Sequence, residues 1–182
     1  DIVSGFHTDP VGLLLSHRAD WAIVSEIEHN DDVIFKPLFS YEMVGICSKD
    51  HPLAEKDIWE AEDFTDASWV TYPVPDDMLD LCCKVLKSKG INPTRRTTEL
   101  TIAMIQLVAS KRGIATVPYW AALPYLEKGY VVARKITKSG LYSNLYAAIR
   151  KEDESLSYLE DFYQTVKSQS FSTLPGLSVL NL

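Results

Sequence analysis

The side chains capable of covalent or metal chemistry are few in this sequence, and they form no recognised catalytic pattern. The four histidines have no regular ligand spacing; they are His7, His17, His29 and His51. No GxSxG, HExxH, GxGxxG, Walker or CxxC string occurs. Those strings place a nucleophile, a metal or a phosphate group in the common enzyme classes. Their absence favours a protein that is not an enzyme and that needs no metal and no cofactor.

Two clusters of polar side chains have both a chemical and a structural interpretation. Asp76, Asp77 and Asp80 could form an acid–base cluster, but acidic residues at the start of a helix also complement its dipole. We favour the dipole interpretation. Cys82 and Cys83 could bind a soft metal, but neighbours on a helix point about 100° apart and cannot easily share one ion. Packing in the core is the better explanation for the cysteines.

Two threonines stand where an expected strand ends and an expected helix begins, Thr8 and Thr101. The free N–H groups of a helix N-terminus bind a carboxylate well, and the helix dipole adds to that attraction. A threonine at this position can also act as a simple N-cap. For each residue taken alone, capping is the favoured interpretation.

The composition is that of an ordinary globular protein, with 46% hydrophobic and 24% charged residues among 182. This length allows one large domain or two lobes with separate cores. The net charge of −7 and the short, isolated basic pairs 95–96 and 111–112 argue against direct binding to nucleic acid. No stretch approaches the roughly 20 apolar residues that cross a bilayer, so no membrane partner is expected. Three cysteines, an odd number, fit a reduced, cytoplasmic setting.

Expected strands alternate with expected helices along the chain, which predicts βαβ units and a mostly parallel sheet. Strands are expected over 19–26, 34–48 (two runs around Pro37), 68–74, 95–100, 113–118, 130–136 and 143–151. Helices are expected over 11–19, 58–65, 75–90, 101–113, 119–129 and 157–170. Asp9 suits an N-cap and Gly90 a helix end. The polar segment 49–57 is expected to be a crossing point or linker, and the tail 171–182 to be irregular.

Three spaced segments resemble the effector-binding domain of LysR-type transcriptional regulators. They are ELTIAMIQLVASKRGIATVPYW (99–120), SKDHPLAEK (48–56) and RADWAIVSE (18–26). In the last of these, Asp20 occupies the family's aspartate position, and His17-Arg18 stand where a glycine is common. Further segments resemble family members that respond to homocysteine and control methionine-biosynthesis genes. They are SGFHTDP, VTYPV, KGYVV and GLYSNLYAAIRK.

The resemblance implies an α/β fold of two lobes, like a type 2 periplasmic binding protein, joined by two crossing strands. Lobe one is expected to comprise residues 1–49 and 147–182, without the family's first strand and helix, and lobe two residues 50–146. The family places a small-molecule effector between its lobes and assembles as a homodimer or homotetramer. Operator DNA is contacted only through an N-terminal helix-turn-helix domain, which is absent from this chain.

The resemblance also implies which residues contact the effector, for which homocysteine is the expected compound. Carried over by position, these residues are Phe6, His7, Thr8, Tyr72, Pro73, Thr101, Ile102, Pro118 and Tyr119. A type 2 solute-binding protein of a transporter shares this fold and is the alternative. The sequence upstream of residue 1 discriminates between the two, because a regulator has a helix-turn-helix there and a transport protein a signal peptide.

Overall fold

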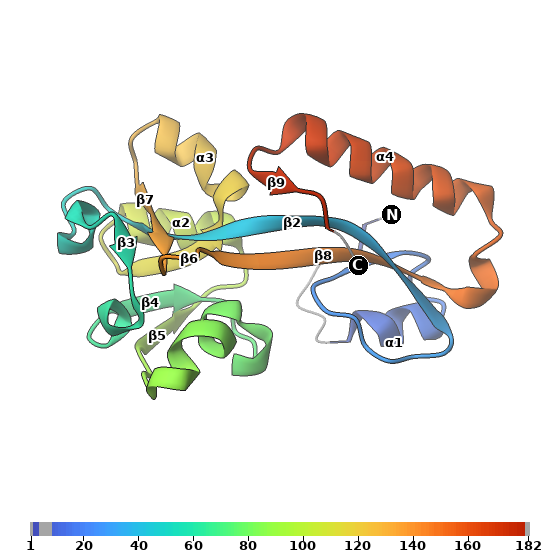
Figure 1. Cartoon of the computed structure of the whole chain (residues 1–182), viewed down its shortest axis with the longest axis horizontal. Helices are drawn as coiled ribbons and strands as arrows, with labels where there is room; N and C mark the ends of the chain where they lie inside the picture. Colours follow the sequence, from blue (N-terminus) through green and yellow to red (C-terminus); the bar gives the residue numbers. More distant parts are fainter. Residues whose placement is uncertain (1, 4–8, 181–182) are drawn as a thin grey trace. The chain divides into compact units, whose positions relative to one another are not determined.

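The computed structural model describes residues 2–3 and 9–180, which divide into two compact units. Unit one comprises residues 1–41 and 143–182, and unit two comprises residues 42–142. The chain passes between the units inside two long strands, β2 (Val33–Cys47) and β8 (Leu141–Arg150) (Figure 1). The sequence had suggested a crossing at the polar segment 49–57. That segment instead holds a short 3-10 turn, η1 (Pro52–Glu55), inside unit two.

Unit one is built around the outer halves of β2 and β8. Its other elements are α1 (Pro10–Leu15), β1 (Ala22–Val24), η6 (Lys151–Asp153), α4 (Ser157–Thr173) and β9 (Leu177–Ser178). β1 pairs antiparallel with β8, and β9 pairs antiparallel with β2. The Asp9 carboxylate accepts a hydrogen bond from the Gly12 amide at 2.7 Å, which confirms the predicted N-cap of α1. This helix is shorter than predicted because the backbone turns left-handed at His17, where φ is 55°.

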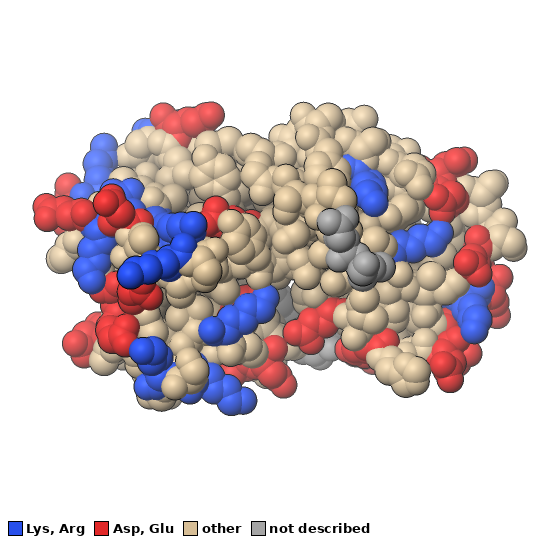
Figure 2. Space-filling model, viewed as in Figure 1, with Lys and Arg blue, Asp and Glu red and all other residues tan. Residues whose placement is uncertain are grey.

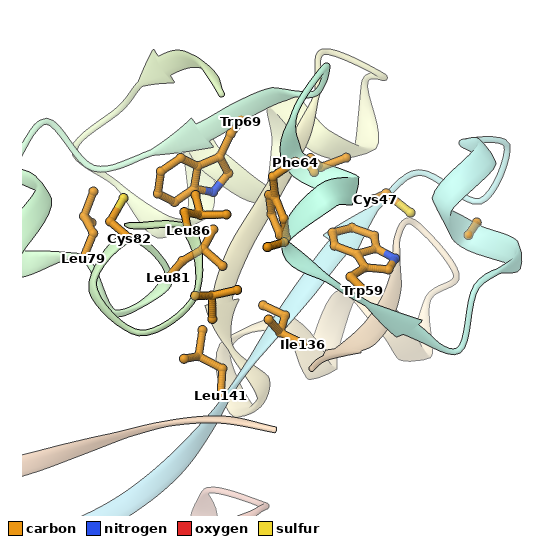
Figure 3. Packing of buried hydrophobic residues seen from close by; sticks show 14 residues of the cluster. Cys47, Trp59, Phe64, Trp69, Leu79, Leu81, Cys82, Leu86, Ile136 and Leu141 are labelled. Carbon is orange, nitrogen blue, oxygen red and sulfur yellow. The ribbon is translucent and has the colours of Figure 1, made fainter. Parts of the chain in front are cut away.

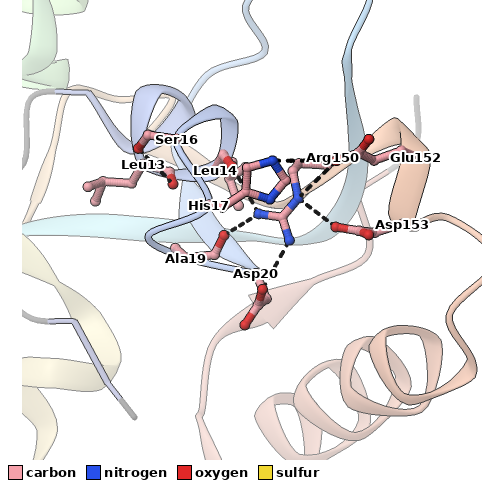
Figure 4. A network of polar contacts seen from close by, with 9 residues as sticks. All are labelled: Leu13, Leu14, Ser16, His17, Ala19, Asp20, Arg150, Glu152 and Asp153. Carbon is pink, nitrogen blue, oxygen red and sulfur yellow. Dashed lines mark hydrogen bonds and ion pairs between the residues drawn. The ribbon is translucent and has the colours of Figure 1, made fainter.

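A buried arginine joins the ends of several unit-one elements (Figure 4). Arg150, the last residue of β8, is 6% exposed. Its Nη1 donates to the carbonyls of Leu14 at 2.9 Å and Ala19 at 2.5 Å. Its Nη2 donates to Asp20 at 3.0 Å, and its Nε to Asp153 at 2.6 Å. The guanidinium therefore ties the last turn of α1, through the Leu14 carbonyl, to the segment that follows it, through the Ala19 carbonyl and Asp20.

Unit two is a mixed sheet with helical segments on both faces. Its strands are the inner halves of β2 and β8, with β3 (Ile58–Trp59), β4 (Ser68–Thr71), β5 (Thr94–Thr97), β6 (Ile114–Pro118) and β7 (Val132–Ile136). β4 lies parallel to both β5 and β6. The prediction of a mostly parallel sheet was wrong, because β2 runs antiparallel to β6 and β7. β2 runs through both units in a single direction. In unit two that direction is opposite to the direction of β6 and β7.

The two faces of the unit-two sheet bury separate apolar clusters. The first face buries Trp59, which is in edge contact with Phe64, and Trp69, which lies beside Leu81 and Leu86 of the helical segment η3–η5 (76–89) (Figure 3). The second face is covered by α2 (Thr101–Ala109) and α3 (Tyr119–Glu127). Its cluster contains Val70, Met104, Ile105, Val108 and Val117. Alternate residues of β4 and β6 point to opposite faces, as the pleat requires.

Several local predictions need correction. The expected two strands around Pro37 are one strand, β2, and the Pro37 carbonyl accepts the hydroxyl of Tyr163 at 2.7 Å. The expected helix 75–90 is a 3-10 turn (Asp76–Met78), a π-turn (Cys82–Leu86) and a second 3-10 turn (Lys87–Lys89). It does end at Gly90, where φ is 68°, as predicted. The expected helix 58–65 is instead β3 followed by the 3-10 turn η2 (Ala61–Phe64).

The charges of the two units differ. Unit one has 12 acidic and 5 basic residues, whereas unit two has 13 of each, so the whole net charge of −7 belongs to unit one. On the face seen in Figure 2, basic and acidic side chains are interspersed over unit two. The face in this view shows no clustered basic patch of the kind that binding to duplex DNA requires. Among the helices of the described residues, none has the length and apolar character to cross a membrane.

Candidate functional site

The carboxyl ends of three parallel strands meet at one edge of unit two. β4 ends at Thr71, β5 at Thr97 and β6 at Pro118. The Thr98 amide donates to the Thr71 carbonyl at 3.0 Å, which holds the segment leaving β5 against the end of β4. Ligands of open α/β sheets bind at such edges, because the loops and helix N-termini that follow the strands gather there.

The N-terminus of α2 presents free donors at this edge. Its cap residue, Leu100, makes no side-chain capping bond, and the first intrahelical bond runs from the Met104 amide to the Leu100 carbonyl at 3.0 Å. The amides of Thr101, Ile102 and Ala103 therefore lack a helical partner, and none of the other described residues accepts a hydrogen bond from them. Because the positive end of the helix dipole lies here, this turn attracts an anion.

Thr101 and Tyr72 bring two hydroxyl groups to the same turn. The Tyr72 phenol and the Thr101 hydroxyl are hydrogen-bonded at 2.6 Å, and both side chains are half-buried. The favoured interpretation of Thr101 as an N-cap was wrong, since Thr101 is the first helical residue and its hydroxyl bonds Tyr72 instead. Each hydroxyl can donate one hydrogen bond and accept others, so the pair can extend a hydrogen-bond network to a ligand anion.

Apolar side chains flank this polar turn. Ile102 is 65% exposed and Leu100 67%, which is unusual for large apolar residues. Pro118 ends β6 at the cap position of α3, where no side-chain capping bond forms. Tyr119 is half-buried against the second-face cluster, and Pro73 is exposed. Of the residues expected at the site, unit two thus supplies six, and Tyr72 and Thr101 are in direct contact.

Phe6, His7 and Thr8 lie outside the described residues. Two residues at the same edge were not anticipated from sequence, namely Thr71, which is 3% exposed, and the exposed Glu99 just before α2. Burial of a strand-end threonine depends on packing, so the sequence carries no signal for Thr71. Glu99 could have been noted as an acidic residue beside a helix start.

The aspartate cluster and the cysteine pair, which have a possible chemical interpretation in the sequence, have structural roles in the fold. Asp76 bonds the Arg95 guanidinium, which holds the pKa of the Asp76 carboxyl below its usual value. Cys82 is buried, as predicted, and burial raises the pKa of its thiol. Core packing was wrong for Cys83, which is exposed and donates to the carbonyl of Asp76 at 3.2 Å and to that of Asp77 at 3.3 Å. Within residues 2–3 and 9–180, no three potential ligands gather to hold a metal ion.

The sequence and the fold match a known family. The family model described as the LysR substrate binding domain matches residues 1–170, so the chain belongs to that family. Within this family, the chain is similar to MetR regulators. The chain is 94% identical over its whole length to the HTH-type transcriptional regulator MetR of Haemophilus influenzae, of which it covers 59%. It is 31% identical to MetR of Escherichia coli, with 96% of this chain and 55% of that protein covered. The chain thus spans little more than half the length of these relatives.

Solved structures agree with this placement. The regulatory domain of MetR, a LysR family regulator from N. meningitidis, has a TM-score of 0.91 and 64% identity. That comparison covers 100% of this chain and 84% of the other. The effector-binding domain of QuiR, solved in complex with shikimate, has a TM-score of 0.72 at 24% identity, which supports the fold alone. The two-lobed α/β fold of this family is therefore the fold of this chain.

Proposed function

We propose that this chain is the effector-sensing domain of a MetR-type transcription regulator and that it binds a small α-amino acid, homocysteine, at the carboxyl edge of unit two. One observation carries the proposal. The N-terminus of α2 has three amides without a described acceptor, and the hydroxyl pair of Tyr72 and Thr101 lies beside them. This arrangement suits an anionic ligand group such as a carboxylate.

Each part of an amino acid has a complementary group at this edge. The carboxylate accepts hydrogen bonds from the amides of α2 and from Thr101. The ammonium group pairs with the exposed carboxylate of Glu99, two residues before the helix. The short apolar tail lies against Ile102, Pro118 and Tyr119. Phe6, His7, Thr8 and Pro73 remain proposed contacts because of the family resemblance.

The proposed output depends on parts of the regulator beyond this chain. Effector binding biases the assembly of a homodimer or homotetramer, and that oligomer contacts operator DNA through its helix-turn-helix domains. The helical segment from Met78 to Lys89 is the proposed self-association surface of unit two. This chain by itself has no useful affinity for DNA, because its net charge is −7.

The transporter alternative shares the fold but is less well supported. The MetR proteins of Haemophilus influenzae and Escherichia coli are named as transcriptional regulators, and that of N. meningitidis as a LysR family regulator. A reduced, cytoplasmic setting, which a regulator requires, also fits the three free cysteines in the described residues.

Calorimetric titration of homocysteine into the parent and into Thr101→Val tests the proposed site. Loss of a hydroxyl that bonds a charged group should weaken binding roughly ten- to a hundred-fold. Ser110→Ala is the matched control, because Ser110 is an exposed hydroxyl residue at the opposite end of the same helix. Equal affinities for Thr101→Val and the parent would show that the carboxylate is not bound at this turn.

A further inference from the structure

The chain after α4, for which an irregular conformation was expected, follows a defined path over unit one. The Leu174 amide ends α4 by donating to the Ser170 carbonyl at 2.8 Å. Pro175 and Gly176 then form a turn, with Gly176 in the left-handed region at φ 77°. A proline followed by a glycine favours a tight turn, since proline fixes its own φ and glycine accepts a positive one. Residues 174–180, the tail strap, thereby turn back into β9, which lies next to β2 (Figure 1).

β9 pairs with β2 at the last residues of β2 that belong to unit one. The antiparallel register joins Ser40 to Ser178 and Tyr41 to Leu177, and unit two begins at the next residue of β2. β8 is also a neighbour of β2, and the Ser40 hydroxyl donates to the Ser143 carbonyl of β8 at 3.2 Å. Because one edge of a strand takes one neighbour at a time, β8 and β9 lie along opposite edges of β2 here. β2 is therefore held on both edges where the chain leaves unit one.

Two apolar contacts anchor the tail strap at its ends. Before the strap, the rings of Phe171 in α4 and Phe39 in β2 meet edge to face, with their centroids 6.3 Å apart. At the far end, Leu180 packs against the unit-one cluster, whereas the preceding Val179 is 64% exposed. The buried members of that cluster come from α1, β1, β2 and β8, and they are Val11, Leu14, Val24, Val33, Tyr146 and Ala148. Leu180 is thus the side chain that secures the end of the strap.

The tail strap is held less firmly than the strands around it. β9 has two residues, and the most enclosed side chains of the strap, Leu174, Leu177 and Leu180, are only half-buried. In β2, by contrast, Phe39 is 4% exposed and Tyr41 9%. Segments with few buried contacts open at a lower free energy than the whole domain unfolds. The strap can therefore leave β2 while the rest of unit one stays folded.

We infer that the tail strap is a releasable restraint on β2 and that it fixes where this crossing strand can bend between the units. While β9 is paired, a change of backbone angles at Ser40 or Tyr41 breaks hydrogen bonds, so bending is confined to the chain beyond them. When the strap is released, one edge of β2 is free and bending extends back into unit one. The family match ends at residue 170, so the strap lies outside it. This inference goes beyond the proposed function and does not depend on the identity of the effector.

Hydrogen exchange followed by mass spectrometry tests the release of the strap. In a chain that ends at Thr173, amides within 38–42 of β2 should exchange roughly tenfold faster than in the parent, because they lose their β9 partner. Amides within 44–47, which pair with β6 and β7, should keep their rates. Leu180→Ala should accelerate the same β2 amides roughly five- to tenfold, since it removes the anchoring side chain. Val179→Ala is the matched control and should change nothing.

A distance measurement tests the bending itself. Spin labels are attached to Cys83, the exposed cysteine of unit two, and to Ser168→Cys on the exposed side of α4, because Cys47 and Cys82 are buried. With labelled protein diluted in unlabelled protein, the distribution of label distances should be broader in the chain that ends at Thr173 and in Leu180→Ala than in the parent. An unchanged width in both variants overturns the inference.

The exchange data provide two further ways to refute the restraint. Parent-like exchange within 38–42 in Leu180→Ala and in the shortened chain would show that β9 does not hold β2. Equal acceleration of all unit-one amides would show that the tail only adds to the global stability of the unit. If the shortened chain does not fold, Leu180→Ala and its Val179→Ala control still decide the outcome, because each changes a single side chain.

Discussion

Replacing Arg150 by methionine should destabilise unit one severely, because the change removes a buried charge on which four acceptors depend. The side chain of Arg150 is 8% exposed, and that of Asp153 is 19% exposed. Asp20, in contrast, is 69% exposed, so water can replace its bond to Arg150 at a cost of at most about 1 kcal/mol. The larger loss comes from Asp153 and from the carbonyls of Leu14 and Ala19, which lose their charged donor.

The expected loss is about 3 to 5 kcal/mol, the usual cost of removing one partner from a buried charge network. That is a large share of the roughly 5 to 15 kcal/mol by which a typical domain is stable. Urea denaturation followed by circular dichroism measures it, with Arg18→Met as the control because Arg18 is exposed. Arg150→Lys should give an intermediate loss, since lysine keeps the charge but cannot reach every acceptor. A free energy of unfolding for Arg150→Met within about 0.5 kcal/mol of the parent would refute this account of unit one.

Two further predictions concern unit two. Gly113→Ala should cost at least about 1 to 3 kcal/mol in urea denaturation, because φ is 148° and an added Cβ would lie 2.1 Å from the Ser68 carbonyl oxygen. Gly90→Ala, at φ 68° in open space, should cost less, and equal losses would contradict the role given to the close approach. Burial lowers the pKa of His51 from its usual 6.5, and its neutral Nδ1 accepts the Leu53 amide at 3.2 Å. Because the unfolded chain then binds the proton more tightly, stability from His51 is present above pH 6.5 and lost as the pH falls below it. His51→Asn should flatten the pH dependence of the urea midpoint between pH 5 and 7, roughly where histidine titrates, and an unchanged slope would exclude this residue.

The local pattern of the sequence is sufficient for most elements near the candidate site. Apolar spacing predicted α2, and the run GIATVP predicted β6, because helix and strand periodicities arise within a few residues of chain. Asp9 and Gly90 were recognised as helix ends for the same local reason. The family resemblance pointed to the strand ends and helix starts of unit two, where free N–H groups accumulate.

Only the tertiary structure decides which side chains meet at those ends. Tyr72 and Thr101 are 29 residues apart in the chain, and Arg150 and Leu14 are 136 apart, so no local pattern could pair them. The direction of β2 against β6 likewise depends on strand pairing, which is non-local. Thr71 looks like any other strand threonine in the sequence. Its burial, at 3% exposed, arises only because neighbouring strands and helical segments pack around the end of β4.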